Sequence, residues 1–226
     1  MIPIWVLLIL GAYLLGSVPI AYVIAKLSRG IDLRQYGSGN VGVSNLLKVT
    51  SKWLAIPVII FDLGKGALVV WVAQLLEFGL LEQVTVGLAA IIGHNWPVFL
   101  RFSGGRGVLT VGGVVLMLSP WLALGGIILT FIGLPFGLMA LTNLLALTLL
   151  PISSWFLSEP LGVQEPLLLT LGLVAILLIV IIRRLTAPKT SFTDSVSRGQ
   201  LLVNRLFWDR DIRDRKAWVN QKPSAN

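Results

Sequence analysis

The sequence lacks cysteine altogether and contains a single histidine, His94. The absence of cysteine excludes disulfide bonds, thiolate chemistry and cysteine-based metal sites. No cluster of His, Asp and Glu has the spacing of metal ligands. A Gly-x-x-x-x-Gly-Lys-Ser/Thr loop and a Ser–His–acid set are also absent. We therefore expect a protein that works without a metal ion or another cofactor.

Charge is also scarce. Only 12% of the 226 residues are charged, whereas 56% are hydrophobic, and the mean hydropathy is +0.88. A soluble domain normally has about 25% charged residues. Residues 108–157 carry no charge at all. These features predict an integral membrane protein with little soluble mass. The first apolar run has no basic n-region or clear cleavage site, so we expect a retained helix.

The apolar runs predict an all-α polytopic protein with about seven transmembrane helices. Roughly 20 apolar residues cross a bilayer core of about 30 Å. Proline and glycine divide the long uncharged region at Ser119-Pro120 and at 134–137, because proline cannot continue a helix. The expected helices occupy residues 3–25, 53–76, 84–100, 108–118, 121–134, 137–157 and 166–182. The fourth is short enough to be a re-entrant half-span.

Lysine and arginine predict the orientation of these helices. Residues 26–52 hold five of them, residues 101–106 hold two, and the region from Arg183 onward holds ten. The loops near 77–82 and 158–165 hold glutamates and no basic residue. Basic loops stay in the cytoplasm. We therefore expect the N-terminus outside and the C-terminus inside.

A first glycine-rich loop, residues 26–48, separates two membrane-length runs. A connector could be half this length, yet this one holds four glycines and four basic residues. Glycine lets backbone N–H groups crowd around an anion, and Lys or Arg neutralises it. The alternative is a flexible loop that follows the positive-inside rule. The candidates for binding a phosphate or an oxyanion are Lys26, Arg34, Gly37, Ser38, Gly39, Asn40, Gly42, Ser44, Asn45 and Lys48.

A second glycine-rich loop, residues 103–107, contains Gly104, Gly105, Arg106 and Gly107 at the start of an expected helix. Flexible amides, the positive end of a helix and a guanidinium fork together favour phosphate binding. Two such loops on one membrane protein predict a phosphorylated substrate that is handled at the bilayer surface.

Charged or titratable residues within the apolar runs are further candidates, because a charge in the membrane is costly. Asp62 and Lys65 are three residues apart and share a helix face. They form either a structural ion pair or part of a substrate cavity. His94 is either a base, with an ordinary pKa of about 6.5, or a ring that holds a helix break by hydrogen bonds. The segment 16–22 is typical of close helix packing by small residues.

The region from residue 186 differs from the rest. Residues 188–191 indicate a linker, after which apolar side chains alternate with Arg198, Arg205, Arg210 and Arg213. A helix of this composition would lie on the membrane surface with its bases toward anionic headgroups. The alternative is a poorly ordered basic tail. We divide the chain into a transmembrane domain, residues 1–185, and a basic amphipathic cytoplasmic tail, residues 186–226.

The arrangement of these motifs resembles the bacterial acyl-phosphate:glycerol-3-phosphate acyltransferases. The similarity covers about residues 16–110 in the same order and spacing. It runs through Gly16-Ser17-x-Pro19-x-Ala21-Tyr22, Lys26, Gly30-x-Asp32-x-Arg34, Gly37-Ser38-Gly39-Asn40-x-Gly42, Asn45, Asp62, Lys65-Gly66, Gly93-His94, Pro97-x-Phe99, Gly104-Gly105-x-Gly107-Val108 and Thr110.

The resemblance implies transfer of an acyl group from acyl-phosphate to the 1-hydroxyl of glycerol 3-phosphate, which gives lysophosphatidic acid and phosphate for phospholipid biosynthesis. It implies a multi-pass protein of the bacterial plasma membrane whose active site faces the cytoplasm. Ser38, Lys48 and Arg106 would be catalytic, and Lys65 and His94 would join the loop residues in binding substrates. The partners are acyl-phosphate, glycerol 3-phosphate and membrane lipids, and we infer neither a nucleic acid nor a protein partner.

The chain departs from the family pattern at several positions. Ser44-Asn45-Leu46-Leu47-Lys48 stands where the family has Thr-Asn-x-x-Arg, and Arg106 stands where it has lysine. Residues 178–185 retain only the Arg-Leu of a third motif, His-x-x-Asn-Ile-x-Arg-Leu, and a Tyr-x-Ser-Leu stretch is not apparent at 134–143. These departures leave two other hypotheses open. One is a divergent paralogue with another acceptor or no turnover, and the other is a transporter of a small phosphorylated solute.

Overall fold

The computed structural model describes residues 3–219, and in this range the chain is helical without a β-strand. Short 3-10 turns, η1 (Leu33–Gln35), η2 (Val98–Leu100) and η3 (Thr193–Ser195), lie between the helices. The α-helices are α1 (Ile4–Gly16), α2 (Ile20–Arg29), α3 (Val43–Val49), α4 (Lys52–Leu75), α5 (Leu80–Asn95), α6 (Val108–Leu118), α7 (Pro120–Ile132), α8 (Met139–Phe156), α9 (Pro166–Leu185), α10 (Arg198–Trp208) and α11 (Arg215–Val219).

The prediction of an all-α membrane protein is confirmed, whereas seven full-length spans are not. Among residues 3–219, four helical segments are long and apolar enough to cross a membrane: α1 with α2, α4, α8 and α9. Helix α5 has 16 residues. Helices α6 and α7 have 11 and 13 residues, which corresponds to about 17 and 20 Å, too short for a core of about 30 Å. The fourth segment is therefore short, as expected for α6, and its re-entrant course stays a prediction.

Proline sets the bends and ends of the N-terminal helices. The first apolar run was expected to be one helix, but it breaks between Gly16 and Ile20. Pro19 lacks an amide hydrogen, and its ring disfavours helical geometry at the preceding residue. Helix α5 ends at Asn95, two residues before Pro97, rather than at residue 100 as expected. Both breaks expose backbone polar groups at the same level of the bundle.

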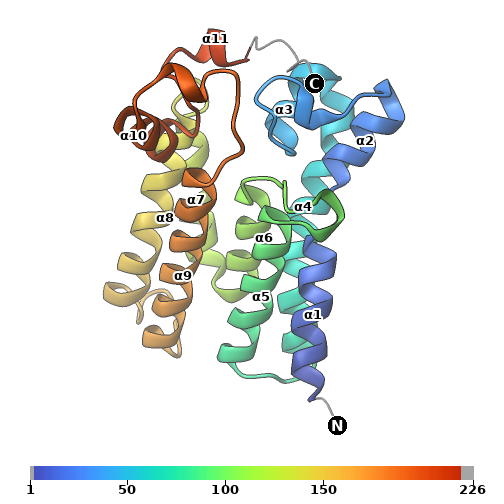
Figure 1. Ribbon diagram of the computed structural model, residues 1–226. Coiled ribbons are helices and arrows are strands. Elements are labelled where there is room, and N and C mark those ends of the chain that lie inside the picture. Colours follow the sequence, from blue (N-terminus) through green and yellow to red (C-terminus); the bar gives the residue numbers. More distant parts are fainter. Residues whose placement is uncertain (1–2, 220–226) are drawn as a thin grey trace.

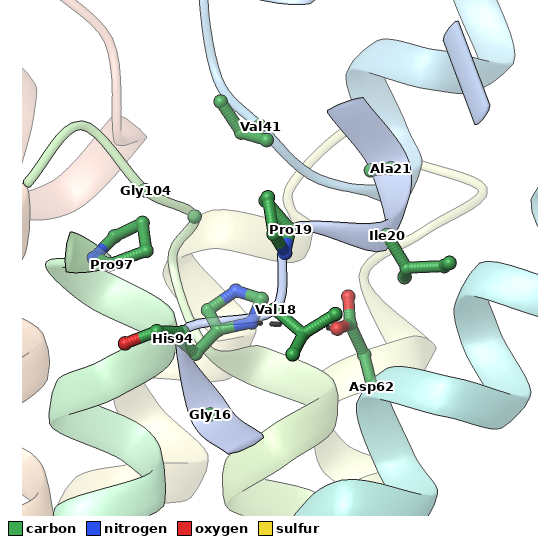
Figure 2. Close-up of a pocket in the computed structure, with 12 residues that line it drawn as sticks. Gly16, Val18, Pro19, Ile20, Ala21, Val41, Asp62, His94, Pro97 and Gly104 are labelled. Atoms are coloured by element: carbon green, nitrogen blue, oxygen red, sulfur yellow. Dashed lines mark ion pairs between the residues drawn. The ribbon is translucent and has the colours of Figure 1, made fainter. Parts of the chain in front are cut away.

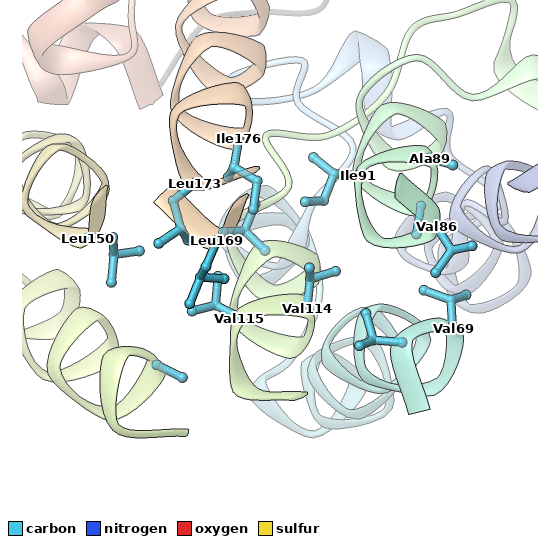
Figure 3. Close-up of a cluster of buried hydrophobic side chains, with 14 of the residues drawn as sticks. Val69, Val86, Ala89, Ile91, Val114, Val115, Leu150, Leu169, Leu173 and Ile176 are labelled. Carbon is cyan, nitrogen blue, oxygen red and sulfur yellow. The ribbon is translucent and has the colours of Figure 1, made fainter. Parts of the chain in front are cut away.

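The core lies between α1 and the helices α4 to α9 (Figure 3). Val70, Ile91, Val114 and Leu173 are each 2% exposed or less. Small residues bring neighbouring helices together: a Cβ on Gly16 of α1 would overlap the Ala90 carbonyl of α5. Many large apolar side chains point outward instead, such as Ile60, Trp121 and Leu167. An apolar outer surface of this extent suits contact with lipid.

The two ends of the bundle differ in structure (Figure 1). Short turns connect α4 to α5 and α8 to α9 at one end. The opposite end carries α2, α3, both glycine-rich loops and the tail helices α10 and α11. This grouping agrees with the uneven distribution of basic residues in the sequence, and it places all candidate phosphate-binding loops together.

The tail is anchored to the bundle rather than loosely attached, because α10 packs against α8 and α9. Arg205 pairs with Asp211 at 2.8 Å and donates to the Leu185 and Ala187 carbonyls. We expected the tail arginines to face lipid headgroups, but Arg205 and Arg210 are 6% and 9% exposed. At Arg205 a packed helix held by buried polar contacts replaces the expected surface helix, and Arg210 lies just after the end of that helix.

Candidate active site

Two kinds of contact fix the first glycine-rich loop: apolar packing against the neighbouring helices and hydrogen bonds from the Asn45 side chain. Leu33, Val41 and Leu46 are buried against α2 and α4. The fully buried Asn45 side chain accepts from the Ser38 amide at 3.0 Å. It also donates to the Leu33 and Tyr36 carbonyls at 3.1 and 2.8 Å. Asn45 was a candidate for substrate binding, but the structure uses its amide to fix the turn around Ser38.

Glycine is required in this turn on steric grounds. Gly37 has a φ of +56°, a region that residues with a Cβ adopt at a cost. A Cβ at Gly37 would also overlap the Asn45 side-chain oxygen. The turn therefore brings the backbone close to Asn45 and leaves Ser38 on the outside. Ser38 Oγ has no hydrogen-bond partner among residues 3–219, so it is available to a ligand.

Two basic candidates in the first loop are already engaged. Arg34 pairs with Asp32 at 2.6 Å and lies over the Tyr22 ring. Hydrogen bonding from Arg34 holds the pKa of Asp32 below its ordinary value of 3.8, despite partial burial. The Lys26 amine is exposed and lies 3.4 Å from the Gly30 carbonyl. Arg34 therefore stabilises the loop, and a substrate would have to compete with Asp32 for it.

Lys48 has no ion pair or side-chain hydrogen bond within the described chain. It lies in the last turn of α3. Although the residue as a whole is exposed, partial desolvation lowers the pKa of its amine, and the positive charges of Arg215 and Arg210 lower it further. Those two arginines belong to the tail, so the charge of the tail acts on the first glycine-rich loop. An anion placed between these groups would relieve their repulsion.

Arg183 of α9 fixes the backbone of the second glycine-rich loop by hydrogen bonds. Arg183 donates from Nε to the Gly105 carbonyl at 2.9 Å and from Nη2 to the Gly104 carbonyl at 2.6 Å. The Gly105 amide donates to the His94 carbonyl at 3.1 Å. A Cβ on Gly105 would overlap His94 Nε2. Close packing of this backbone against His94 explains why glycine stands there.

Arg106 projects from this loop toward the tail. Its Nε lies 2.9 Å from Asp209 Oδ1, and its Nη1 donates to the Arg183 carbonyl at 3.2 Å. Only 13% of the side chain is exposed. These contacts fix one edge of the guanidinium, while Nη2 has no partner among residues 3–219. A guanidinium with a fixed orientation and a free N–H edge suits a phosphate oxygen.

Beneath both loops lies a buried ionic cluster, which consists of Asp62, Lys65 and His94. Figure 2 shows Asp62 and His94. Asp62 Oδ1 is 2.8 Å from Lys65 Nζ and 3.5 Å from His94 Nδ1. Lys65 also donates to the Gly16 carbonyl at 2.9 Å, which the helix break leaves without its intrahelical partner. The cluster therefore ties α4 and α5 to the end of α1.

The cavity at this cluster is too small for a phosphorylated substrate. Its volume is about 10 Å³, which is about the space for one water molecule. Ser17 Oγ lines it and has no partner among the described residues. Figure 2 shows Val41 of the first loop and Gly104 of the second on its upper side. This small polar cavity is therefore the place where both loops meet the membrane helices.

The structure divides the predicted site residues into two groups. One group has hydrogen-bond or ion-pair partners within the protein, which indicates that its members stabilise the fold around the site. It consists of Asn45, Arg34, Lys65 and His94. Within residues 3–219, Ser38 and Lys48 have unpaired functional groups, and Arg106 has one partly free edge. Gly39 and Gly107 have positive φ angles. Asn40 and Gly42 are half-buried in the first loop, and Ser44 is exposed.

Sequence reasoning missed the residues that join the C-terminal half to this site. Arg183 was noted only as a basic residue and Arg184 only as part of the Arg-Leu that remains of the third motif, but each is 3% exposed. Arg184 donates to the Asn143 side chain at 3.1 Å and to the Leu206 carbonyl at 2.7 Å. Asp209 reaches Arg106. The signals in the sequence were the retained Arg-Leu of the third motif and an arginine pair directly after a long apolar run, which the positive-inside rule also explains.

The chain was compared with known proteins. Residues 6–189 match the family model described as glycerol-3-phosphate acyltransferase. A curated relative, glycerol-3-phosphate acyltransferase 4 of Dehalococcoides mccartyi strain CBDB1, is 44% identical over 100% of this chain and 97% of its own length. A glycerol-3-phosphate acyltransferase of Exiguobacterium sibiricum is 51% identical over 55% of this chain and 59% of its own length.

Solved structures of similar fold are also integral membrane proteins. A crystal structure of PlsY (YgiH), an integral membrane glycerol 3-phosphate acyltransferase in its glycerol 3-phosphate form, superimposes with a TM-score of 0.74 and 31% identity. The alignment covers 94% of this chain and 96% of that protein. The lysophosphatidic acid form superimposes with a TM-score of 0.72 and 29% identity, over 97% of this chain and 100% of that protein.

Proposed function

This chain belongs to the glycerol-3-phosphate acyltransferase family, and from that premise we propose that its acyl donor is acyl-phosphate and that its catalytic groups lie on the two glycine-rich loops. The acceptor is the 1-hydroxyl of glycerol 3-phosphate, and the products are lysophosphatidic acid and inorganic phosphate. We further propose that the protein lies in the bacterial inner membrane and that the end of the bundle with both glycine-rich loops, the loop end, faces the cytoplasm. The observation that carries the proposal is Ser38, whose hydroxyl is unpaired on a turn that Asn45 holds from below.

The described residues suit electrostatic catalysis rather than covalent catalysis through a triad. The acceptor oxygen attacks the acyl carbonyl carbon, and the bond between that carbon and the phosphate oxygen breaks. Phosphate leaves with the bonding electrons, and the hydroxyl proton passes to a phosphate oxygen of a substrate. The chain itself then has to orient the two substrates and offset the charge of their phosphates.

Each proposed role follows from a local feature. Ser38 and nearby loop amides would orient the reacting groups, because the turn holds them at the loop surface. Lys48 and Arg106 would neutralise phosphate charge, since a cation without a full complement of partners interacts strongly with an anion. His94 would not act as the base, because Nδ1 faces Asp62 and Gly105 packs against Nε2.

A product assay tests this proposal. Purified wild-type protein and Ser38→Ala, in detergent or lipid, would receive palmitoyl phosphate and glycerol 3-phosphate, and lysophosphatidic acid and free phosphate would be quantified. We expect equal amounts of both products from the wild type. We expect a loss of at least about 100-fold in Ser38→Ala with an unchanged melting temperature, by analogy with the loss of one oxyanion-stabilising donor.

Two results would contradict it. Wild-type protein that binds glycerol 3-phosphate saturably but forms no product from palmitoyl phosphate would show another donor, another acceptor or no turnover. Near-normal turnover in Ser38→Ala would remove Ser38 from the catalytic groups. A palmitoyl-thioester donor, tested alongside, separates the first of these explanations from the others.

A further inference from the structure

The tail reaches the active site through a short corner, residues 208–211, directly after α10. Asp209 ends the helix with a φ of +55°, a left-handed conformation that aspartate tolerates better than most residues. The chain reverses here, and consecutive side chains consequently have different partners. Asp209 faces Arg106 of the second loop, whereas Asp211 faces Arg205 and two threonines of the tail.

The corner has a fixed position because Asp211 anchors it. Asp211 is 1% exposed. It accepts from Thr190 and Thr193 at 2.7 Å each and from Arg205 at 2.8 Å. Its carbonyl also accepts from Asn204 at 2.9 Å. Arg205 in turn is bonded to carbonyls at the end of α9. The position of residue 210 is therefore tied to the membrane bundle by several polar contacts.

Arg210 stands out within this corner as a buried cation without an anionic partner. It is 9% exposed, and its Nε has no hydrogen-bond partner among residues 3–219. Its guanidinium lies over the Trp208 ring, 5.7 Å from the centroid. A buried polar N–H group without a partner costs free energy. A ligand that accepted from Arg210 would remove this cost.

The surroundings of Arg210 are positively charged. Burial lowers its pKa, and the charge of Arg215 lowers it further, although Asp209 and Asp214 oppose the shift. Both of these carboxylates have other partners. Asp209 pairs with Arg106, and Asp214 accepts from the amides of residues 216 and 217 at the start of α11. The positive charge of Arg210 also acts on Lys48 of the first loop, which has no ion-pair partner among the described residues.

The corner contacts the second glycine-rich loop through the ion pair of Asp209 with Arg106, and the positive charge of its Arg210 acts on Lys48 of the first loop. We propose that the corner is a third wall of the active site and that Arg210 binds a substrate phosphate together with Lys48 and Arg106. This inference rests on the proposed function. It also offers an explanation for the absence of the His and Asn of the third motif. Arg210 of the tail would supply a phosphate-binding group at the same end of α9, in place of those two residues.

The phosphate in question has two possible substrate sources, glycerol 3-phosphate and the acyl-phosphate donor. The test measures KM for each, with palmitoyl phosphate as donor, in full-length Arg210→Ala. Arg213→Ala is the matched control, because Arg213 is an exposed arginine of the same tail without a partner in the described chain. Both variants remove one positive charge, so a general effect of tail charge would appear in both.

We expect Arg210→Ala to raise KM for one of the two substrates by about 10- to 100-fold, the range for a hydrogen bond to a charged group. Arg210→Lys should recover part of this loss, and Arg213→Ala should remain within about twofold of wild type. The substrate whose KM changes identifies the phosphate. Melting temperatures and Arg210→Gln, which retains a side-chain donor, separate loss of binding from loss of folding.

Three outcomes would overturn the inference. In the first, a folded Arg210→Ala protein has wild-type KM values for both substrates. In the second, Arg210→Ala and Arg213→Ala change KM equally. In the third, the effect appears only in vesicles with anionic lipid and vanishes in neutral lipid, which would assign Arg210 to lipid headgroups. A wild-type protein that forms no product would instead contradict the proposed function itself.

Discussion

The buried ionic cluster of Asp62, Lys65 and His94 contrasts with the cations at the loop end, Lys48 and Arg210. In the cluster each charge has a partner inside the protein, and Lys65 is within 3 Å of both a carboxylate and a backbone carbonyl. Lys48 and Arg210 have no anionic partner within the described residues. Both regions contain residues that the sequence marked as candidates for substrate binding.

The contrast shows that a charge near the membrane does not by itself indicate function. A buried charge is costly unless it is paired and hydrogen-bonded. The ionic cluster meets this condition and joins α4 and α5 to the end of α1. Arg210, which is buried, leaves this condition unmet among the described residues, and Lys48, which is exposed, has no anionic partner there. A phosphorylated substrate would pair with both cations. We therefore expect variants of the cluster to change stability and variants of the loop end to change substrate binding.

The largest expected effect is on stability. Asp62→Ala leaves Lys65 buried without its carboxylate, and removal of one member of a buried pair typically costs about 3–5 kcal/mol. Thermal or denaturant unfolding in detergent would measure the loss. Asp194→Ala serves as the control, because its ion pair with Lys189 is exposed and 3.9 Å long. An Asp62→Ala protein as stable as this control would remove the structural role of the cluster.

A smaller effect concerns the pH dependence of tail docking. Burial acts to raise the pKa of Asp211, but hydrogen bonds from Arg205, Thr193 and Thr190 outweigh it and leave the pKa below 3.8. A carboxyl group whose pKa is lowered by folding stabilises the protein above its unfolded-state pKa. This contribution is lost as the pH falls through the folded-state pKa.

The corresponding measurement compares wild type with Asp211→Asn between pH 3 and 7. We expect the wild type to be more stable by a constant amount above about pH 5, and we expect the difference to shrink below pH 3.8. A difference that grows on acidification would show that Asp211 is protonated in the docked tail. In that case Asp211, the residue that anchors the corner, would carry no charge, and the corner would differ further from the ionic cluster.

The sequence predicted the helices with strong apolar patterns and the general location of the site. Helix α6 has the expected bounds, and α4 differs from its expected range by one residue at each end. The break at Pro19 was missed, because the surrounding side chains are as apolar as a continuous helix requires. Glycine and basic residues correctly directed attention to the two loops, since their chemistry is local.

The partners of individual site residues could not be predicted from local pattern. The contact between Arg106 and Asp209, like that between Arg183 and Gly104, joins distant parts of the chain through tertiary packing. The amide of Asn45 could bind a substrate or hold a turn, and the sequence does not distinguish these roles. Its burial and its hydrogen bonds in the structure show that it holds the turn. For the same reason the sequence grouped Lys65 with Lys48, although their surroundings differ.

The most direct test of this account compares Lys48→Met with Lys65→Met in one experiment that measures melting temperature, KM and turnover per folded molecule. We predict that Lys48→Met melts like the wild type and raises KM for a phosphorylated substrate by roughly tenfold. We predict that Lys65→Met loses several kcal/mol of stability, while the protein that remains folded keeps the wild-type KM. A stable Lys65→Met protein with a raised KM, together with unchanged kinetics in Lys48→Met, would contradict the account.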